Sequence, residues 1–145
     1  MEEVVLTENE QKKAYLQRYR KHVKRIKRIE SEIEEIREMK KHPSVNNDGM
    51  PHGSSNGDLS GYAALLDEKE RELERERYLR VKSYTEINNQ IEQLESETER
   101  DLLHYRYIKG LAWWEVAEKL DCSEREVYRK HGKALNNFKI PETCH

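Results

Sequence analysis

The sequence has little of the apolar and aromatic material that a broad hydrophobic core requires. Of its 145 residues only 34% are apolar, phenylalanine occurs once, and charged residues reach 39%. This composition leaves too little apolar material for a wide sheet-type core. It favours long, mostly exposed helices with narrow apolar stripes, together with one small compact unit. We therefore predict an all-α fold.

Long apolar runs and paired cysteines are also missing. No run is long enough to span a bilayer, and the acidic start MEEVVLTENE has too few apolar residues for a secretory signal. Cys122 and Cys144 form no paired framework and no CxxC motif, and Cys144 with His145 lacks the further ligands of a metal site. We expect a soluble, cytoplasmic protein with no membrane association, no bound metal and no cofactor.

Acidic and basic residues nearly balance, but they are unevenly placed. The formal net charge of −2 gives no bulk attraction to nucleic acid or anionic lipid. Nevertheless residues 11–29 hold nine basic residues and no acidic one, and residues 125–139 hold five basic residues against Glu126 alone. Two electropositive surfaces are therefore predicted. For the basic 11–29 helix two interpretations stay open, namely solubility, or contact with DNA phosphate or an acidic protein.

Residues 8–41 are predicted to form one long helix. Apolar residues recur along this segment at a seven-residue spacing with further apolar residues between them, and no Gly or Pro interrupts it. The stripe consists of Leu16, Tyr19, Val23, Ile26, Ile29, Ile33 and Ile36. A stripe this narrow on so charged a helix needs a partner helix to cover it.

A flexible loop is predicted for residues 42–60, where two Pro, three Gly and many short polar residues gather. A second long helix follows, with Asp58 or Ser60 as its cap, and runs from Tyr62 to about Leu94. The loop allows this helix to return antiparallel to the first one.

An antiparallel return brings apolar residues of the two stripes together. The register pairs Ile36 with Leu66, Ile29 with Leu73 and Tyr19 with Tyr84. Residues 8–94 are therefore predicted to form a helical hairpin of the coiled-coil type. The apolar stripe of the second helix is interrupted, because Arg77 and Arg80 stand where apolar residues would be expected. Two ways of covering the interrupted stripe therefore stay open. The two long helices can pair within one chain, or they can pair between two chains in a homo-oligomer.

Residues 97–139 have a different pattern, with short helices and fuller apolar faces. A first helix over 102–108 stops at Gly110, which serves as its C-terminal cap. A second helix begins near Ala112, and Asp121-Cys122-Ser123 forms a three-residue turn after it. A third helix follows the turn.

The turn and the residues around it are typical of a helix-turn-helix. Ala117 is small enough for a position where two helices cross closely, and Asp121 stands where many such units have Gly. Ser123 with Glu126 forms a capping box that opens the third helix. One side of that helix carries Val127, His131, Leu135 and Phe138. Its other side is then free to enter the major groove of DNA.

The exposed side of the third helix is rich in groups that bind DNA. Arginine makes bidentate contacts to guanine, whereas lysine is better suited to phosphate. The candidate DNA-binding residues are Glu124, Arg125, Tyr128, Arg129, Lys130 and Lys133. Double-stranded DNA is the predicted partner.

The segment from Tyr105 to Leu135, YRYIKGLAWWEVAEKLDCSEREVYRKHGKAL, resembles region 4 of bacterial sigma factors. The resemblance implies that the helix around 102–108 meets the flap of RNA polymerase. It also implies that four residues of the third helix read a promoter element, namely Glu124, Arg125, Tyr128 and Arg129. The whole arrangement is similar to small phage and prophage transcriptional regulators of Gram-positive bacteria, including the ArpU-like group.

The sequence contains no nucleophile motif, no paired-carboxylate pocket and no nucleotide-binding fingerprint, so no enzymatic activity is expected. We predict a sequence-specific, DNA-binding transcriptional regulator that acts with RNA polymerase and is encoded by a phage or prophage. Two alternatives come from other classes. One is a phage DNA-packaging adaptor of the terminase small-subunit type. The other is a coiled-coil interaction protein whose helix-turn-helix is only structural.

Overall fold

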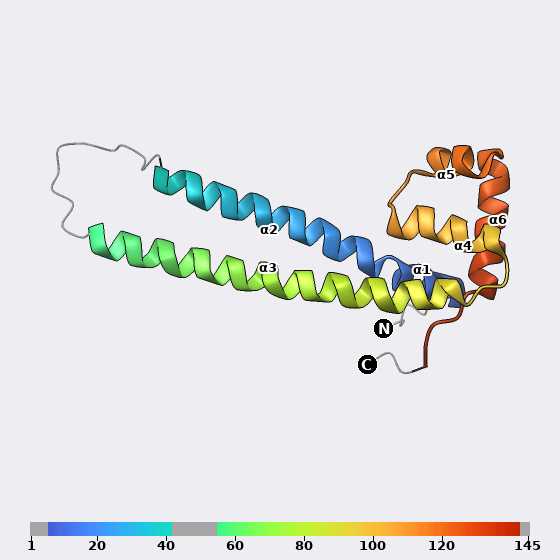
Figure 1. Cartoon of the computed structure of the whole chain (residues 1–145), viewed down its shortest axis with the longest axis horizontal. Helices are drawn as coiled ribbons and strands as arrows, with labels where there is room; N and C mark the ends of the chain where they lie inside the picture. The colour runs from blue at the N-terminus through green and yellow to red at the C-terminus, as the bar shows by residue number, and fades with distance from the viewer. Residues whose placement is uncertain (1–5, 42–54, 143–145) are drawn as a thin grey trace, which may run out of the picture. The chain divides into compact units, whose positions relative to one another are not determined.

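The described part of the chain is almost wholly helical (Figure 1). The computed structural model describes residues 6–41 and 55–142, and for residues 41 and 55–59 it describes the backbone alone. Within these residues there are six α-helices, one π-helical segment and no strand. They are α1 (Glu8–Leu16), α2 (Arg18–Lys41), α3 (Ser55–Glu92), α4 (Glu97–Leu103), η1 (His104–Ile108), α5 (Trp113–Leu120) and α6 (Glu124–Asn137). The all-α prediction is confirmed, and no described helix has the length and apolar character to cross a membrane.

Helix α3 begins earlier than the sequence predicts. The predicted cap positions Asp58 and Ser60 lie inside the helix, which starts at Ser55. The loop prediction is therefore wrong for the last residues of its range. Because each added residue gains one helical hydrogen bond, a strong helix can extend backward through weak helix formers. The rest of the predicted loop, residues 42–54, lies outside the described residues, as does the pair Cys144-His145.

A break at Gln17 separates α1 from α2, so the predicted single helix is corrected to two consecutive helices. Gln17 has φ −75° and ψ −10°, and its N–H donates to the Lys13 carbonyl at 2.9 Å. The Lys21 N–H in turn donates to the Gln17 carbonyl at 3.2 Å. Helical hydrogen bonds thus continue on both sides of the break.

The chain folds into two compact units that combine segments distant in sequence. One unit comprises residues 22–79 and contains most of α2 and much of α3. The other comprises the chain up to residue 21 and from residue 80 onward, so α1 and the last turns of α3 belong with the C-terminal helices. This division differs from the predicted one, which joined residues 8–94 in a hairpin and separated residues 97–139.

Within residues 22–79, α2 and α3 lie side by side and run in opposite directions (Figure 1). Ile26, Ile29 and Ile33 form a buried cluster with Leu73, and Leu66 packs against this cluster. The cluster contains the predicted pair of Ile29 and Leu73. Apolar contact between the two helices therefore follows the predicted antiparallel register at this level.

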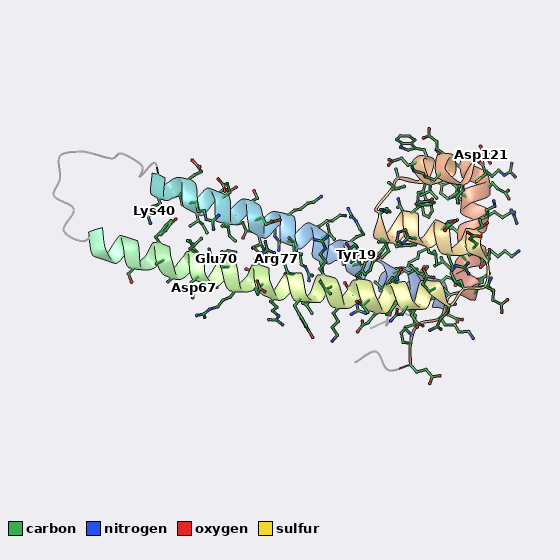
Figure 2. All side chains as sticks on the ribbon, in the orientation of Figure 1. Tyr19, Lys40, Asp67, Glu70, Arg77 and Asp121 are labelled. Atoms are coloured by element: carbon green, nitrogen blue, oxygen red, sulfur yellow. The ribbon has the colours of Figure 1, made fainter. Side chains whose placement is uncertain are left out.

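Ion pairs line the edges of the same unit. Arg77, which is labelled in Figure 2, is exposed and forms an ion pair with Glu30 at 3.8 Å. It is one of the two arginines that interrupt the apolar stripe in the sequence. Lys69 and Glu32 lie 2.6 Å apart. The hydrogen bond between them raises the pKa of Lys69 and lowers the pKa of Glu32. Charged side chains thus occupy the edges and leave the centre to apolar residues.

The other unit is built around a core drawn from all of its helices. Its buried residues include Leu16, Ile87, Ile91, Leu102, Leu103, Val116, Val127, Leu135 and Phe138. The rings of Tyr19 and Tyr84 meet with centroids 5.6 Å apart, as the predicted register requires. Tyr15 of α1 packs on Phe138, just after α6, at 5.9 Å. This core fixes α6, which carries the predicted site residues.

Candidate nucleic-acid interface

A three-residue turn joins α5 to α6. Asp121 follows α5 in the left-handed conformation, with φ 55° and ψ 51°, and Figure 2 labels it at the corner between the two helices. Among residues with a side chain, Asp and Asn adopt this conformation most readily, so Asp121 can stand where Gly is common. The Cys122 N–H then donates to the Ala117 carbonyl at 3.1 Å and closes the end of α5.

Apolar residues on both sides of the turn hold α5 against α6. Val116 and Val127 are fully buried, and Ala117 is 5% exposed. A small residue at such a position lets two helices approach closely. Ser123 fixes the start of α6, because its hydroxyl accepts the N–H of Glu126 at 3.2 Å. The core and the cap together set the direction of α6 relative to α5.

The outer face of α6 presents most of the predicted DNA-binding residues. Five of the six predicted residues are exposed, and Lys130 is half-buried. The exposed residues are Glu124, Arg125, Tyr128, Arg129 and Lys133. Arg125, Arg129 and Lys133 follow one another at four-residue intervals and therefore share one side of the helix. We call these three residues the basic stripe. By the helical period the basic stripe lies opposite the buried residues Val127 and Leu135.

Arg129 of the basic stripe is held by Glu126. Its guanidinium donates to both carboxylate oxygens, from Nε at 3.2 Å and from one terminal nitrogen. These hydrogen bonds lower the pKa of Glu126 and raise the pKa of Arg129. The Glu126 carboxylate is thus engaged by Arg129, and the capping-box prediction holds only for the hydroxyl of Ser123.

An aromatic cluster lies beside α6. The hydroxyl of Tyr107 is hydrogen-bonded to Nε2 of His131 at 2.7 Å, and the Trp113 ring meets the imidazole with centroids 4.6 Å apart. Burial lowers the pKa of His131 to about 4, and the charges of Lys13 and Arg106 add to this effect. Burial also raises the pKa of Tyr107 to about 12. The cluster is therefore uncharged at neutral pH and contributes packing rather than charge.

Two exposed aromatic side chains accompany this cluster. Tyr128 is 50% exposed, and its ring packs edge-on against Trp113 at 5.5 Å. Trp114 is 55% exposed. Trp114 was not among the predicted site residues. A signal for it exists in the sequence, because only one of two adjacent tryptophans on a helix can point inward.

The helix before α5 changes form along its length. After α4 it continues as the π-helical η1, and Gly110 follows with φ +73° as the predicted glycine cap. Its apolar residues are buried, namely Leu102, Leu103, Tyr107 and Ile108. The predicted contact with the polymerase flap would therefore have to use the polar side of this helix.

Sequence reasoning missed the packing of α1 against the end of α6. The buried ammonium of Lys12 donates to the Leu135 carbonyl at 2.8 Å and lies 3.4 Å from the Asn136 carbonyl. The Asn9 amide donates to Oδ1 of Asn136 at 3.0 Å. One signal was present, because Lys12 precedes Leu16 by four residues and so lies on the buried side of α1.

Comparison with known families places the chain in one of them. Residues 39–139 match the DUF1492 family, which is described as a protein of unknown function. The match covers well over half of the sequence, and the chain belongs to this family. The matched residues include α3 to α6, whereas α1 lies outside the match. No curated protein and no solved structure matches the chain.

Proposed function

We propose that the protein binds double-stranded DNA, with α5, the 121–123 turn and α6 acting as a helix-turn-helix and with α6 as the recognition helix. The observation that carries this proposal is the basic stripe, which lies on the exposed side of a helix whose opposite side is buried. A recognition helix needs this combination, because one side must hold the helix at a fixed angle while the other meets base edges.

The side chains of the basic stripe suit two kinds of contact. Arg125 and Lys133 form no ion pair with any described residue, so both are available to DNA. Arginine pairs in bidentate fashion with O6 and N7 of guanine, and lysine acts as a point charge toward phosphate. We assign base contacts to Arg125 and Arg129 and a phosphate contact to Lys133. The half-buried Lys130 is assigned to phosphate at the edge of the interface.

Glu124 and Tyr128 complete the predicted set at the beginning of α6. A carboxylate such as that of Glu124 can accept a hydrogen bond from N4 of cytosine. Tyr128 can donate a hydrogen bond from its hydroxyl to a phosphate or sugar oxygen. Both residues are exposed, which supports their assignment to the same interface.

Regulation of transcription is the role that we propose for this DNA binding. The resemblance of residues 105–135 to region 4 of sigma factors supports it, since that region reads promoter DNA beside RNA polymerase. The same resemblance supports RNA polymerase as the protein partner and a phage or prophage origin. We interpret the paired helices of residues 22–79 as an antiparallel coiled coil that contacts the polymerase or a second copy of the chain.

Selection of binding sites from a randomised duplex library tests the proposal. The wild type is compared with an Arg125→Ala/Arg129→Ala variant. The control is Arg75→Ala/Lys82→Ala, which removes two exposed positive charges from α3 instead. We expect the wild type and the control to enrich one common motif and the Arg125/Arg129 variant to enrich none. If all three proteins enrich the same motif, α6 is not the recognition helix.

A further inference from the structure

We propose that the DNA-binding surface extends from α6 onto α1, where Lys13 binds a phosphate of the DNA backbone. This inference rests on the proposed function, because it takes α6 as the helix that enters the major groove. It assigns a second, sequence-independent contact to a helix that sequence reasoning placed in another domain.

The length of α6 supports a backbone contact near its end. The helix has 14 residues, which corresponds to about 21 Å at the usual rise per residue. The major groove of B-DNA is only about 12 Å wide. A helix that enters the groove with its first turns therefore passes over the phosphate backbone with its last turn. Whatever lies beside the last turn of α6 faces phosphates rather than bases.

Helix α1 is the element that lies there. The Asn9 amide donates to Asn136 at 3.0 Å. Asn136 follows Lys133 by three residues and Arg129 by seven, so it continues the line of the basic stripe. Lys13 follows Asn9 by four residues and occupies the same side of α1 one turn further on. The basic stripe therefore continues through the two asparagines to Lys13.

Lys13 is an exposed cation on α1. It forms no ion pair with any described residue. The acidic residues of α1 are engaged elsewhere, because Glu8 lies 3.6 Å from Lys12 and Glu10 accepts the Thr7 N–H at 3.1 Å. The positive charge of Lys13 is therefore available to an anion. DNA offers closely spaced phosphates along each strand, and neutralising them releases bound counterions.

The salt dependence of DNA affinity tests this inference. Lys13→Ala and the wild type are titrated with the duplex selected from the library, or with a random duplex of the same length if no motif is enriched. We expect Lys13→Ala to bind roughly three- to tenfold more weakly on selected and random duplexes alike. Its slope of log affinity against log salt should be shallower by about 0.9. Lys13→Arg should restore both values, and Lys82→Ala should change neither.

Shortening the DNA provides a second measurement. A duplex that lacks the phosphates beneath the last turn of α6 should bind the wild type as weakly as the full duplex binds Lys13→Ala. Lys13→Ala should lose nothing further on the short duplex. If Lys13→Ala does not fold, the test is the wild type on the two duplexes. Equal affinity for the short and the full duplex would overturn the inference.

The outcomes separate this inference from the proposed function. Unchanged affinity and slope for Lys13→Ala, with binding still lost in Arg125→Ala/Arg129→Ala, would overturn the Lys13 contact and leave the recognition helix standing. An equal loss in Lys82→Ala would also overturn it, since bulk charge would then explain the effect. If the wild type binds no duplex at all, the proposed function fails and the inference fails with it.

Discussion

The hydroxyl of Tyr107 is hydrogen-bonded to Nε2 of His131 at 2.7 Å, and this bond joins η1 to α6. The bond joins a neutral phenol to a neutral imidazole, whichever of the two ring nitrogens carries the proton. Burial maintains this state, since it lowers the pKa of His131 to about 4 and raises the pKa of Tyr107 to about 12. The core beside α6 is therefore sensitive to acid.

We predict that the free energy of unfolding falls as the pH is lowered from about 6.5 to about 4. The unfolded chain binds a proton at His131 near pH 6.5, whereas the folded protein does so only near pH 4. Because the pKa is lower in the folded state, this contribution to stability is complete above about pH 6.5 and is lost as the pH falls. The slope for one proton is at most about 1.4 kcal/mol per pH unit.

Urea unfolding across this pH range measures the slope. His131→Gln keeps an amide that can hydrogen-bond to Tyr107 but does not titrate, so its stability should change less between about pH 6.5 and pH 5, above the range of most carboxylates. Identical pH profiles for the two proteins would show that His131 is not the responsible group.

Replacing Lys12 should destabilise the unit that contains α6. The last carbonyls of a helix lack regular helical partners, and the buried Lys12 ammonium supplies a charged donor at that end. Lys12→Met keeps an apolar side chain and removes the charge. We expect it to lower the free energy of unfolding by about 1.5–3 kcal/mol, as for other hydrogen bonds to charged groups. Urea denaturation measures the loss.

Lys13→Ala is the control for this measurement, because Lys13 lies next in sequence but is exposed. Its stability should stay within about 0.5 kcal/mol of the wild type. A Lys12→Met protein as stable as the control would mean that the cap on α6 contributes nothing in solution.

Two glycines should respond in opposite ways to alanine. Gly110 has φ +73°, and an added Cβ would lie 2.6 Å from Cζ of Arg20. The left-handed backbone alone costs about 1–2 kcal/mol for a residue with a side chain. Gly132 lies inside α6, and an added Cβ would meet nothing within 4 Å apart from its two chain neighbours and the backbone of the helix itself, so Gly132→Ala should stabilise the protein by about 0.5–1 kcal/mol.

A double variant separates the two causes at Gly110. Adding Arg20→Ala to Gly110→Ala should recover the steric part of the loss and leave the backbone part, as measured by urea denaturation. If Gly110→Ala and Gly132→Ala shift stability in the same direction, the left-handed conformation at Gly110 is not required.

Glu126→Gln should reduce sequence discrimination and strengthen non-specific binding. The Glu126 carboxylate holds the Arg129 guanidinium in one orientation, and that constraint favours a directed base contact. Removing one negative charge near phosphates should raise affinity for random duplex roughly two- to fivefold. Library selection should show a weaker preference at one base position. Glu118→Gln makes the same charge change at an exposed position of α5, and equal behaviour of the two variants would exclude an orienting role for Glu126.

The C-terminal helices could be predicted closely because their signals are local. The predicted glycine cap is found at Gly110, the second helix begins just after Ala112, and Ser123 caps α6. Each of these boundaries depends on residues within one turn of the chain. The choice between the two partners of Glu126 was not predictable, because the Ser123 N–H and the Arg129 side chain compete for it at similar separations along the helix.

The packing of α1 could not be predicted by the same means. A lysine in a polar stretch is ordinarily interpreted as a surface residue, since lysine is almost never buried without a partner. The partners of Lys12 are backbone carbonyls that lie 123 and 124 residues further along the chain. No periodicity within α1 indicates which distant helix end it meets. The division of the chain into units therefore needed the structure.

The contact of Lys12 with Leu135 also has a consequence for the order of events during synthesis. The two residues are 123 positions apart, so at ordinary rates of translation α1 leaves the ribosome roughly 6 to 25 s before the end of α6 does. Until then α1 has no C-terminal partner, whereas α2 and α3 can already pair. A polypeptide released before α6 is made would keep the long paired helices but lack both the basic stripe and the helix end that α1 stabilises. Under the proposed function, such a fragment would compete for the partner of the long helices without engaging DNA.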